Sequence, residues 1–380
     1  MVQVALLALF SLVSILMAGP IDIDHREIVR AVDRTTIDES TLIQEAQDKQ
    51  VVLVGESHTN PHHHAIQLSI IKKSYESNPN LAVGMEMFPK DLQPELDRWV
   101  AGELEEEAFL DAVSWYFTWG YDADLYLPIL RFVKEKGIPL FAMNVRREVV
   151  RAVRMQGMAQ LAREIRNQLP EIAPASGAYR GYLSEIFESH PMMAGKMRFD
   201  YFVEAQQVWD GVMADAIVNW LADHPEAQVV GLAGSGHLLQ GFGIPYQLEH
   251  RGVDQVVTVI PWSVGGDWAP GDAGTYVWGT QESPDTLPPV RLGIHLVEED
   301  GSVKIEKISE KSIAATSDLQ AGDRIQRLND IPIQTSHALV RLLRGVAWGD
   351  RLILDILRKD QPIQIHIELP SSPPPPSHMG

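Results

Sequence analysis

Five short apolar runs, separated by segments with helical spacing, constrain the fold of this chain more than any other feature. Each run is short enough to be a strand buried on both faces. The runs cover residues 51–54, 81–85, 138–143, 228–233 and 255–260. From Phe199 to Trp220, apolar side chains recur at intervals of three or four, which is typical of an amphipathic helix. Alternating strands and helices predict an α/β fold with a mostly parallel sheet flanked by helices.

Changes in composition divide the chain of 380 residues into domains. Residues 266–289 are rich in Gly, Pro, Asp and Ser, which is typical of a linker. This linker separates an α/β domain (20–265) from a smaller domain (290–369), in which runs such as 302–308 alternate apolar and polar residues and predict β-structure. Residues 370–380, with four consecutive prolines, predict a disordered tail.

Residues 1–19 form an almost unbroken apolar segment that ends in small residues. This pattern is typical of a signal peptide, although the basic residues that normally precede the apolar core are absent. We therefore expect export to the periplasm or cell envelope. A retained membrane anchor and a buried helix are the alternatives for this segment.

Charge and composition exclude several classes of function. The formal net charge of −19 argues against nucleic-acid binding, because such proteins need a basic surface. The absence of cysteine excludes disulfides, thiolate metal sites and thiol catalysis. An apolar fraction of 45% with 22% charged residues is that of a globular protein.

Polar side chains follow four of the five predicted strands. Glu56 and His58 follow the first strand, Glu86 the second, Asn144 the third and His237 the fourth. In an open parallel sheet, ligands bind beyond the carboxyl ends of the strands, where the loops converge. We therefore predict a functional site centred on Glu56, His58, Glu86 and His237. The alternative is that these side chains are solvated or cap neighbouring elements, as polar residues at strand ends commonly do.

Three consecutive histidines follow the first of these strands. Asn60 and Pro61 predict that a helix begins here, because Asn is a favoured N-cap and Pro suits the first helical position. Consecutive helical residues point about 100° apart, so His62, His63 and His64 cannot all face one site. We expect at most one or two of them to face it, the alternative for each being that it packs or contacts solvent.

Motifs in a fixed order span roughly residues 49–261. They are Val-Gly-Glu-Ser-His58, Asn60-Pro61-x-His63-His64-x-x-Gln67, Met85-Glu86, Ala142-x-Asn144, Arg147-Glu148-x-Val150, Glu204-Ala-Gln206-x-x-Trp209-Asp210-x-x-Met213-Ala214 and Ala233-Gly-x-Gly-His237. Together these motifs resemble the ChaN-like haem-binding family, a branch of the Tiki, TraB and erythromycin-esterase grouping.

The resemblance implies haem binding or iron acquisition at the cell envelope, a tyrosine as iron ligand and dimerisation around stacked haems. Tyrosine is a known ligand of haem iron. The candidate ligands are Tyr179, Tyr182 and Tyr201, with His190 as a second axial group, and the further cofactor-binding candidates are His58, His63, His64 and His237. Tyr121 and Tyr126 lie at helical spacing in an apolar segment, and we expect them to pack rather than to bind a ligand.

The same resemblance implies a rival function, because the Tiki and esterase branches are hydrolases. Glu56, His58, Glu86 and His237 carry the groups that bind Zn, Mn or Co, and a carboxylate or imidazole can also act as a general base. A metal-dependent hydrolase or protease is therefore the alternative function. The chain contains no contiguous His-Glu-x-x-His motif.

The smaller domain carries a second set of motifs. They are Arg291-Leu-Gly-Ile294, Leu319-x-x-Gly322-Asp-Arg-Ile325, Asn329-x-x-Pro332-Ile333 and Gly349-Asp350. These motifs resemble a PDZ domain, which binds an extended peptide as an added strand. The resemblance implies that Arg291, Leu292, Gly293 and Ile294 capture a terminal carboxylate. His337, at the start of a predicted helix over 336–344, is a candidate contact for a peptide side chain.

Three functions remain open on the sequence alone. The leading hypothesis is an envelope protein that binds haem or iron and recruits a partner through its PDZ domain. The second is the metal-dependent hydrolase, to which the PDZ domain delivers peptide ends. The third is a PDZ adaptor whose first domain is inactive. The expected partners are haem, a C-terminal peptide or envelope protein, and a second copy of the chain.

Overall fold

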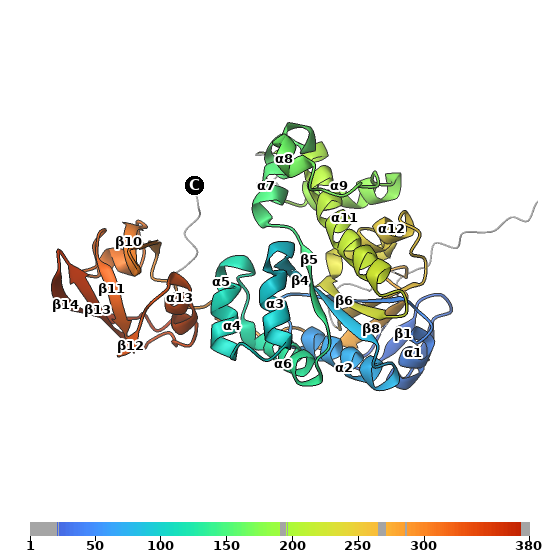
Figure 1. Ribbon diagram of the computed structural model, residues 1–380, viewed down its shortest axis with the longest axis horizontal. Coiled ribbons are helices and arrows are strands. Elements are labelled where there is room, and N and C mark those ends of the chain that lie inside the picture. The colour runs from blue at the N-terminus through green and yellow to red at the C-terminus, as the bar shows by residue number, and fades with distance from the viewer. Residues whose placement is uncertain are drawn as a thin grey trace, which may run out of the picture.

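The chain folds into a larger α/β domain and a smaller β-rich domain that lie side by side (Figure 1). The computed structural model describes residues 21, 23–190, 195, 197–264, 271–285 and 287–373. The predicted signal or anchor segment, residues 1–19, lies outside the described residues, as does the end of the predicted tail. Within the described residues, no helix combines the length and the apolar character needed to cross a membrane.

The α/β domain is built on an eight-stranded sheet with the order β2-β1-β8-β7-β3-β6-β4-β5. The strands are β1 (Ile28–Arg30), β2 (Thr35–Ile37), β3 (Val51–Glu56), β4 (Leu81–Pro89), β5 (Leu140–Asn144), β6 (Gln228–Gly234), β7 (Val256–Ser263) and β8 (Tyr276–Thr280). From β8 to β5 every pair is parallel, whereas β1 and β2 add an antiparallel edge. The predicted mostly parallel sheet is confirmed, and each of the five predicted runs forms a strand.

Helices cover both faces of this sheet. They are α1 (Glu39–Ala46), α2 (Pro61–Ser77), α3 (Gln93–Val100), α4 (Glu106–Ala112), α5 (Trp115–Thr118), α6 (Leu127–Lys136), α7 (Arg147–Gln156), α8 (Arg163–Arg166), α9 (Gly177–Glu188), α11 (Phe199–Asp223) and α12 (Ile244–Glu249). Successive residues of a strand point to opposite faces. Val52 and Val54 therefore join the cluster that contains α2, α3 and α6, while Val51 and Leu53 join the cluster of α11 and α12.

The predicted linker, residues 266–289, contains part of this sheet. Residues 276–280 form β8, which pairs with β7 on one side and β1 on the other. The segment predicted as a linker therefore contributes one strand to the sheet of the α/β domain. The strand was missed because it has only five residues, and the Gly- and Pro-rich segment around it conceals the buried Tyr276 and Val277.

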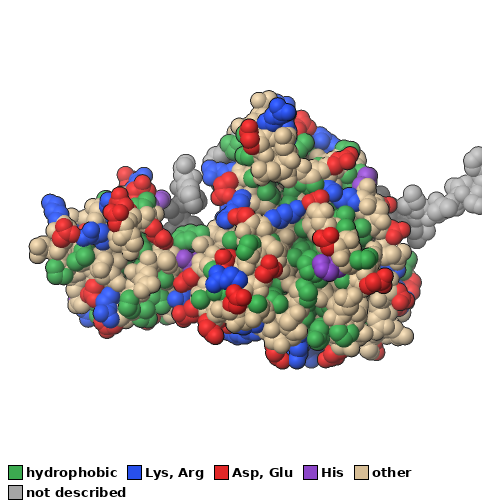
Figure 2. Space-filling model, in the orientation of Figure 1, with side chains coloured by type: hydrophobic (Ala, Val, Ile, Leu, Met, Phe, Trp, Pro, Cys, Tyr) green, Lys and Arg blue, Asp and Glu red, His purple; other side chains and the backbone are tan. Residues whose placement is uncertain are grey.

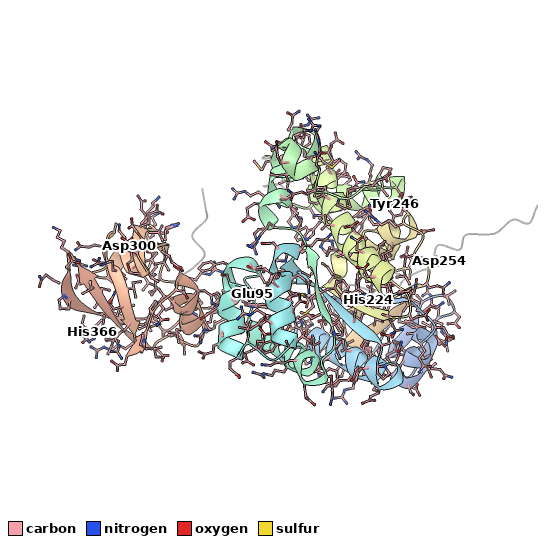
Figure 3. The ribbon with its side chains drawn as sticks, viewed as in Figure 1. Glu95, His224, Tyr246, Asp254, Asp300 and His366 are labelled. Carbon is pink, nitrogen blue, oxygen red and sulfur yellow. The ribbon has the colours of Figure 1, made fainter. Side chains whose placement is uncertain are left out.

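The smaller domain is a six-stranded antiparallel sheet with one α-helix and a 3-10 turn at Ala314–Thr316. Its elements are β9 (Ile294–Glu299), β10 (Ser302–Ile308), β11 (Arg324–Leu328), β12 (Ile331–Pro332), β13 (Arg351–Arg358), β14 (Gln361–Glu368) and α13 (Ser336–Arg344). Among the described strands, β9 lies at the edge of the sheet and pairs with β10 alone. Thr335 caps α13 by accepting a hydrogen bond from the Ala338 N–H. Asp300 and His366 lie on this domain, and Tyr246 and Asp254 lie on the far side of the larger one (Figure 3).

Candidate functional site

The polar residues at the strand ends meet at one edge of the sheet. β3, β6 and β4 are neighbours, so their carboxyl ends bring Glu56, His237 and Glu86 together, with His58 just beyond β3. The Glu86 carboxylate accepts a hydrogen bond from the Gly234 N–H at 2.6 Å, which ties the end of β4 to that of β6. We call this edge of the sheet the rim. One cavity of about 430 Å³, the rim cavity, is lined by Glu56, His58, Glu86 and His237.

Glu56 is the centre of the first hydrogen-bond network at this site. Its carboxylate is buried and lies 2.6 Å from His58 Nδ1 and 2.9 Å from His64 Nδ1. The Tyr126 hydroxyl donates to the same carboxylate at 3.1 Å. Burial alone would raise the pKa of Glu56, but the contacts with His58 and His64 outweigh it and lower the pKa to about 2. Glu56 is therefore ionised, and it fixes the orientation of the His58 ring.

The His58 ring is held by Glu56 on one edge and packed by aromatic rings on its faces. Its centroid lies 4.7 Å from the ring of Trp119 and 4.7 Å from that of Tyr121. Burial lowers the pKa of His58, but the hydrogen bond to Glu56 outweighs it, and the pKa lies above its ordinary value. Tyr121 and Tyr126, expected only to pack, therefore also shape the site.

A second network joins α11 to the turn after β6. His237 Nδ1 lies 2.6 Å from Asp210 Oδ1, and His237 Nε2 lies 3.5 Å from Glu86 Oε1. Tyr179 donates to the other Asp210 oxygen at 2.8 Å. Burial lowers the pKa of His237, but the charges of Glu86 and Asp210 outweigh it and raise the pKa to about 9. His237 is therefore protonated at neutral pH.

Two helices roof the cavity above these networks. α9 contributes Tyr179, Tyr182, Leu183 and Ile186, and α11 contributes Phe202, Gln206 and Trp209. The Trp209 Nε1 and Ser235 Oγ atoms are buried and have no hydrogen-bond partner within the described residues. A mostly apolar roof over two charged networks, with unsatisfied polar atoms in the wall, is typical of a ligand site.

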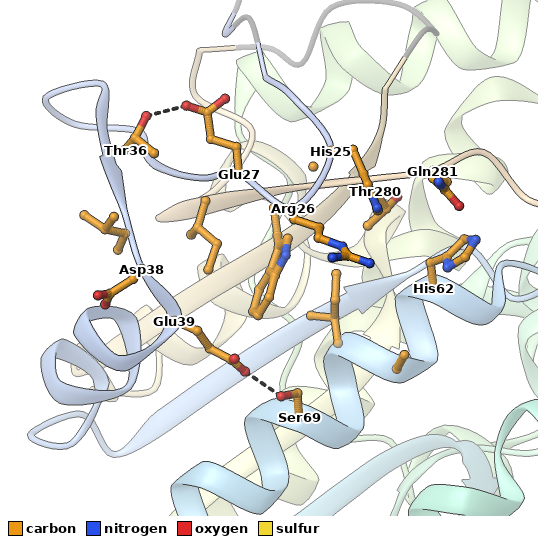
Figure 4. A pocket seen from close by; sticks show the side chains of 16 residues that line it. His25, Arg26, Glu27, Thr36, Asp38, Glu39, His62, Ser69, Thr280 and Gln281 are labelled. Carbon is orange, nitrogen blue, oxygen red and sulfur yellow. Dashed lines mark hydrogen bonds between the residues drawn. The ribbon is translucent and has the colours of Figure 1, made fainter.

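The three consecutive histidines point in different directions, as helix geometry predicts. His64 contacts Glu56, while His63 Nδ1 accepts the Ser57 N–H at 2.8 Å and burial lowers the pKa of His63 to about 4. His62 lines a separate cavity of about 640 Å³ between α2 and the β1–β8 edge (Figure 4). This cavity is larger than the rim cavity, but Glu56, His58, Glu86 and His237 do not line it.

The candidate iron ligands fall in different places. Tyr179 and Tyr182 line the rim cavity, and the Tyr182 hydroxyl has no hydrogen-bond partner within the described residues, whereas that of Tyr179 is bonded to Asp210. Tyr201 does not line the cavity and packs near Arg198 and Gly157. His190 is exposed at the end of α9, where its Nδ1 contacts the Ile186 carbonyl. The Pro-Met-Met segment that follows His190 lies outside the described residues.

A basic vestibule leads into the rim cavity. It has a volume of about 480 Å³, shares His58 and Trp209 with the rim cavity, and is lined by Arg147, Arg151, Arg154 and Arg291. Among the residues that the structure describes, no carboxylate lines the vestibule and none of the four arginines has an ion-pair partner. Basic side chains gather near α7 on the face shown in Figure 2. In a chain with a net charge of −19, this vestibule is suited to an anionic ligand.

Three arginines of the vestibule have a signal in the sequence, which is their spacing along α7. Residues 147, 151 and 154 are spaced four and three apart, so they share one face of α7. Asp210 was likewise not predicted as a site residue, although it interrupts the apolar stripe of α11 and is fully buried. A carboxylate on the buried face of a helix indicates a specific partner.

The described residues contain no group of three His, Asp or Glu side chains that could hold a metal ion. The carboxylates are already engaged, Glu56 by two histidines and Asp210 by His237 and Tyr179. The arrangement gives the predicted Zn, Mn or Co site no support. It consists instead of two carboxylate–histidine pairs facing one cavity.

The predicted peptide-binding residues of the smaller domain separate into two groups. Arg291, Leu292, Gly293 and Ile294 line a groove of about 480 Å³ between β9 and α13. His337 does not line this groove, because its Nδ1 lies 2.6 Å from Asp111 Oδ1 and its Nε2 accepts the Tyr116 N–H at 3.2 Å. Its side chain is directed at α4 and α5 of the larger domain.

The fold and the rim define an α/β protein of the Tiki type joined to a PDZ domain. Residues 42–248, more than half of the chain, match the family described as haem-binding uptake, Tiki superfamily, ChaN, and the chain belongs to this family. Residues 290–369 match the PDZ domain.

Two solved structures and one curated protein illustrate the similarity. A structure of cofacial haem binding to ChaN of Campylobacter jejuni is 21% identical with a TM-score of 0.53, covering 66% of this chain and 95% of that one. An erythromycin esterase mutant in its open conformation is 11% identical with a TM-score of 0.39, covering 62% of this chain and 76% of that one. The protein RETICULATA-RELATED 5, chloroplastic, of Arabidopsis thaliana is 24% identical over 231 residues, which are 56% of this chain and 31% of that protein. The chain thus spans about a third of the length of this relative.

Proposed function

We propose that the α/β domain binds haem in the rim cavity and serves haem uptake or iron acquisition at the cell envelope, while the PDZ domain recruits a peptide or protein partner. The observation that carries this proposal is Tyr182, which lines the roofed cavity and whose hydroxyl has no hydrogen-bond partner within the described residues. Family membership and the apolar roof of α9 and α11 support it.

The residues present suit a flat, apolar ligand that carries carboxylates. Leu183, Ile186 and Phe202 supply apolar contacts, and the unsatisfied Trp209 Nε1 is available to a polar group of the ligand. In the adjoining vestibule, Arg151 and Arg154 would hold the ligand's carboxylates. When bound, ferric haem would supply a Lewis-acidic iron that accepts an oxygen or nitrogen ligand from the protein.

Tyr182 and His58 are the side chains best placed to serve as that ligand. Burial raises the pKa of Tyr182, and the nearby Glu185 adds to this, so the phenol stays protonated until a cation lies against it. His58 presents Nε2 towards Gly234, because its Nδ1 is held by Glu56. A carboxylate behind a ligating histidine orients the ring and increases its basicity.

Hemin titration of the purified protein tests the proposal. A Soret band distinct from that of free hemin is expected, with a shifted maximum or at least tenfold weaker binding in Tyr182→Phe. Tyr201→Phe is the matched control and should behave like the wild type, because Tyr201 does not line the cavity. Identical hemin spectra in the presence and absence of the wild-type protein would refute haem binding.

Two further parts of the proposal need their own measurements. Dimerisation around stacked haems would appear as a hemin-dependent increase in mass during sedimentation. Export predicts that protein recovered from the envelope fraction begins after the apolar residues 1–19. A mass that is unchanged by hemin, or recovery only from the cytosolic fraction, would contradict these parts separately.

A second candidate function is hydrolysis, which the two carboxylate–histidine pairs favour. Asp210 fixes His237, Glu56 fixes His58, and both rings face the same cavity, which is an arrangement suited to general acid–base catalysis. Turnover of ester or peptide substrates that is lost in the His58→Ala, His237→Ala double variant would support it. Equal turnover in the double variant would exclude this site. Peptide binding without haem binding or turnover would favour an adaptor.

A further inference from the structure

The groove between β9 and α13, called here the PDZ groove, adjoins the basic vestibule. They meet where the two domains are in contact, and this region is called the seam. Gly120, Arg147 and Arg291 line both cavities, and the vestibule in turn shares His58 with the rim cavity. The α/β domain contributes Tyr116, Gly120 and Arg147 to the wall of the groove. The groove is therefore lined by both domains, and it adjoins the vestibule that shares His58 with the rim cavity.

The carboxylate-binding end of the groove is formed by backbone that has unused donors. Gly293 has a φ of +78°, and a Cβ on it would lie 2.2 Å from Ser312 Cβ, so the loop requires glycine. The carbonyls of Leu292 and Gly293 accept hydrogen bonds from Ala314 and Ser309, but the N–H groups of these two residues donate to nothing within the described residues. Two adjacent free N–H groups form a ready site for an anion.

The charge of the groove is positive on both sides of the seam. Arg147, Arg291 and Arg344 line it, and no carboxylate from the described part of the chain does. Arg147 donates to the carbonyls of Thr118 and Trp119, and Arg344 donates to the carbonyl of Gly120. These contacts position the guanidinium groups without neutralising them. Asp122 is near enough to Arg344 to act on it electrostatically, but it does not line the groove.

The rest of the groove is suited to an extended peptide with an apolar end. β9 has one unpaired edge, which faces α13, so a peptide can add to the sheet there. Leu292, Leu339 and Leu343 line the groove and provide an apolar pocket beside the loop. A free C-terminal carboxylate next to an apolar last side chain matches this combination of donors, charge and surface.

We propose that this seam seats the C-terminal carboxylate of a partner peptide between Arg147 of the α/β domain and Arg291 of the PDZ domain, at the entrance to the His58 site. The proposal rests on the peptide-recognition part of the proposed function and extends it, because it makes Arg147 of the other domain a specificity residue for the peptide end. It is independent of haem binding.

Fluorescence anisotropy on the full chain tests the proposal without hemin. The probes are labelled hexapeptides ending in Val, Leu or Phe, each made with a free carboxylate and as the C-terminal amide. The free-acid probe should bind the wild type about tenfold more tightly than the amide. Arg147→Ala should remove most of that difference, and Arg147→Lys should restore part of it. Arg163→Ala, which changes an exposed arginine on α8, is the matched control and should have no effect.

The outcomes separate this proposal from the proposed function. If the acid probes bind and Arg147→Ala leaves their affinity unchanged, the peptide carboxylate does not lie against Arg147. Peptide recognition by the PDZ domain then stands without the interdomain contact. Equal affinity for acid and amide probes likewise contradicts the binding of a terminal carboxylate between Arg147 and Arg291. If no probe binds the wild type, both the interdomain contact and peptide recognition fail, and the hemin titration still decides haem binding by itself.

Discussion

Asp210 Oδ1 lies 2.6 Å from His237 Nδ1, and both side chains are buried. Because this contact and Glu86 raise the pKa of His237 to about 9 in the folded protein, folding favours the protonated ring. The stabilisation is fully present below the ordinary histidine pKa near 6.5 and is lost as the pH rises through about 9. Urea unfolding should therefore show a loss of about 3 kcal/mol between pH 7 and pH 10 that depends on His237.

The matched variants for this alkaline effect are His237→Gln and His250→Gln. Glutamine cannot titrate, so His237→Gln should be less stable at pH 7 and should lose much less stability than the wild type towards pH 10. His250 is exposed on the surface, and its replacement should leave the profile unchanged. An alkaline loss of the same size in His237→Gln would show that another group carries it.

The lowered pKa of Glu56 predicts that the free energy of unfolding decreases as the pH falls, which is the opposite direction to the effect of His237. Its pKa of about 2 lies below the ordinary value of 4.5, so its contribution is present above pH 4.5 and is lost as the pH falls towards 2. Glu56→Gln breaks a buried pair and should cost about 3 kcal/mol at pH 7. The stability gap to the wild type, measured by urea unfolding, should narrow from pH 5 to pH 3. The exposed Glu226→Gln is the control, and a gap that stays constant over this range would contradict the assignment.

The strands and the rim were predictable because both depend on local patterns. Buried parallel strands are continuous apolar runs, and their carboxyl ends must meet at one edge, so Glu56, Glu86 and His237 followed from chain order alone. β1 and β2 have three residues each, which is too short for a periodic signal. The contact of Asp210 with His237 joins a helix to a distant turn, and no spacing along the chain specifies it.

The place of His337 was likewise beyond the sequence. The helix that carries it was predicted over the observed residues 336–344, but its partner Asp111 is 226 positions away in the other domain. The packing of one domain on another depends on two surfaces that fold separately. No local sequence pattern therefore predicts which residues meet between the domains. The resemblance to PDZ domains predicts that His337 contacts the peptide, whereas in this structure its ring stacks on Tyr116 of the neighbouring domain.

Gly243 supports the His237 turn and predicts a contrast with Gly241. Both have positive φ, +64° and +69° respectively, so alanine is strained at either position. At Gly243 a Cβ would also lie 2.4 Å from the His237 carbonyl oxygen and 3.0 Å from Asp210 Oδ1, whereas at Gly241 it meets nothing within 4 Å. Gly241→Ala should cost about 1 kcal/mol and Gly243→Ala at least about 3 kcal/mol in urea unfolding. Equal costs would show that the clash is relieved without loss.

His337 should control the docking of the two domains. Its Nε2 accepts the Tyr116 N–H at 3.2 Å and its ring stacks on Tyr116 at 5.2 Å, so the amide of Tyr116 is protected by a side chain of the other domain. His337→Ala removes this acceptor and leaves Asp111 without its 2.6 Å contact. Amide hydrogen exchange at Tyr116 should then accelerate about tenfold or more, while the buried amides of β3 stay unchanged.

The control for this prediction is His366→Ala, which replaces an exposed histidine on β14 of the same domain. Unchanged exchange at Tyr116 in His337→Ala would mean that Arg341 and Arg344, which contact Glu107 and Gly120, hold the domains together without His337.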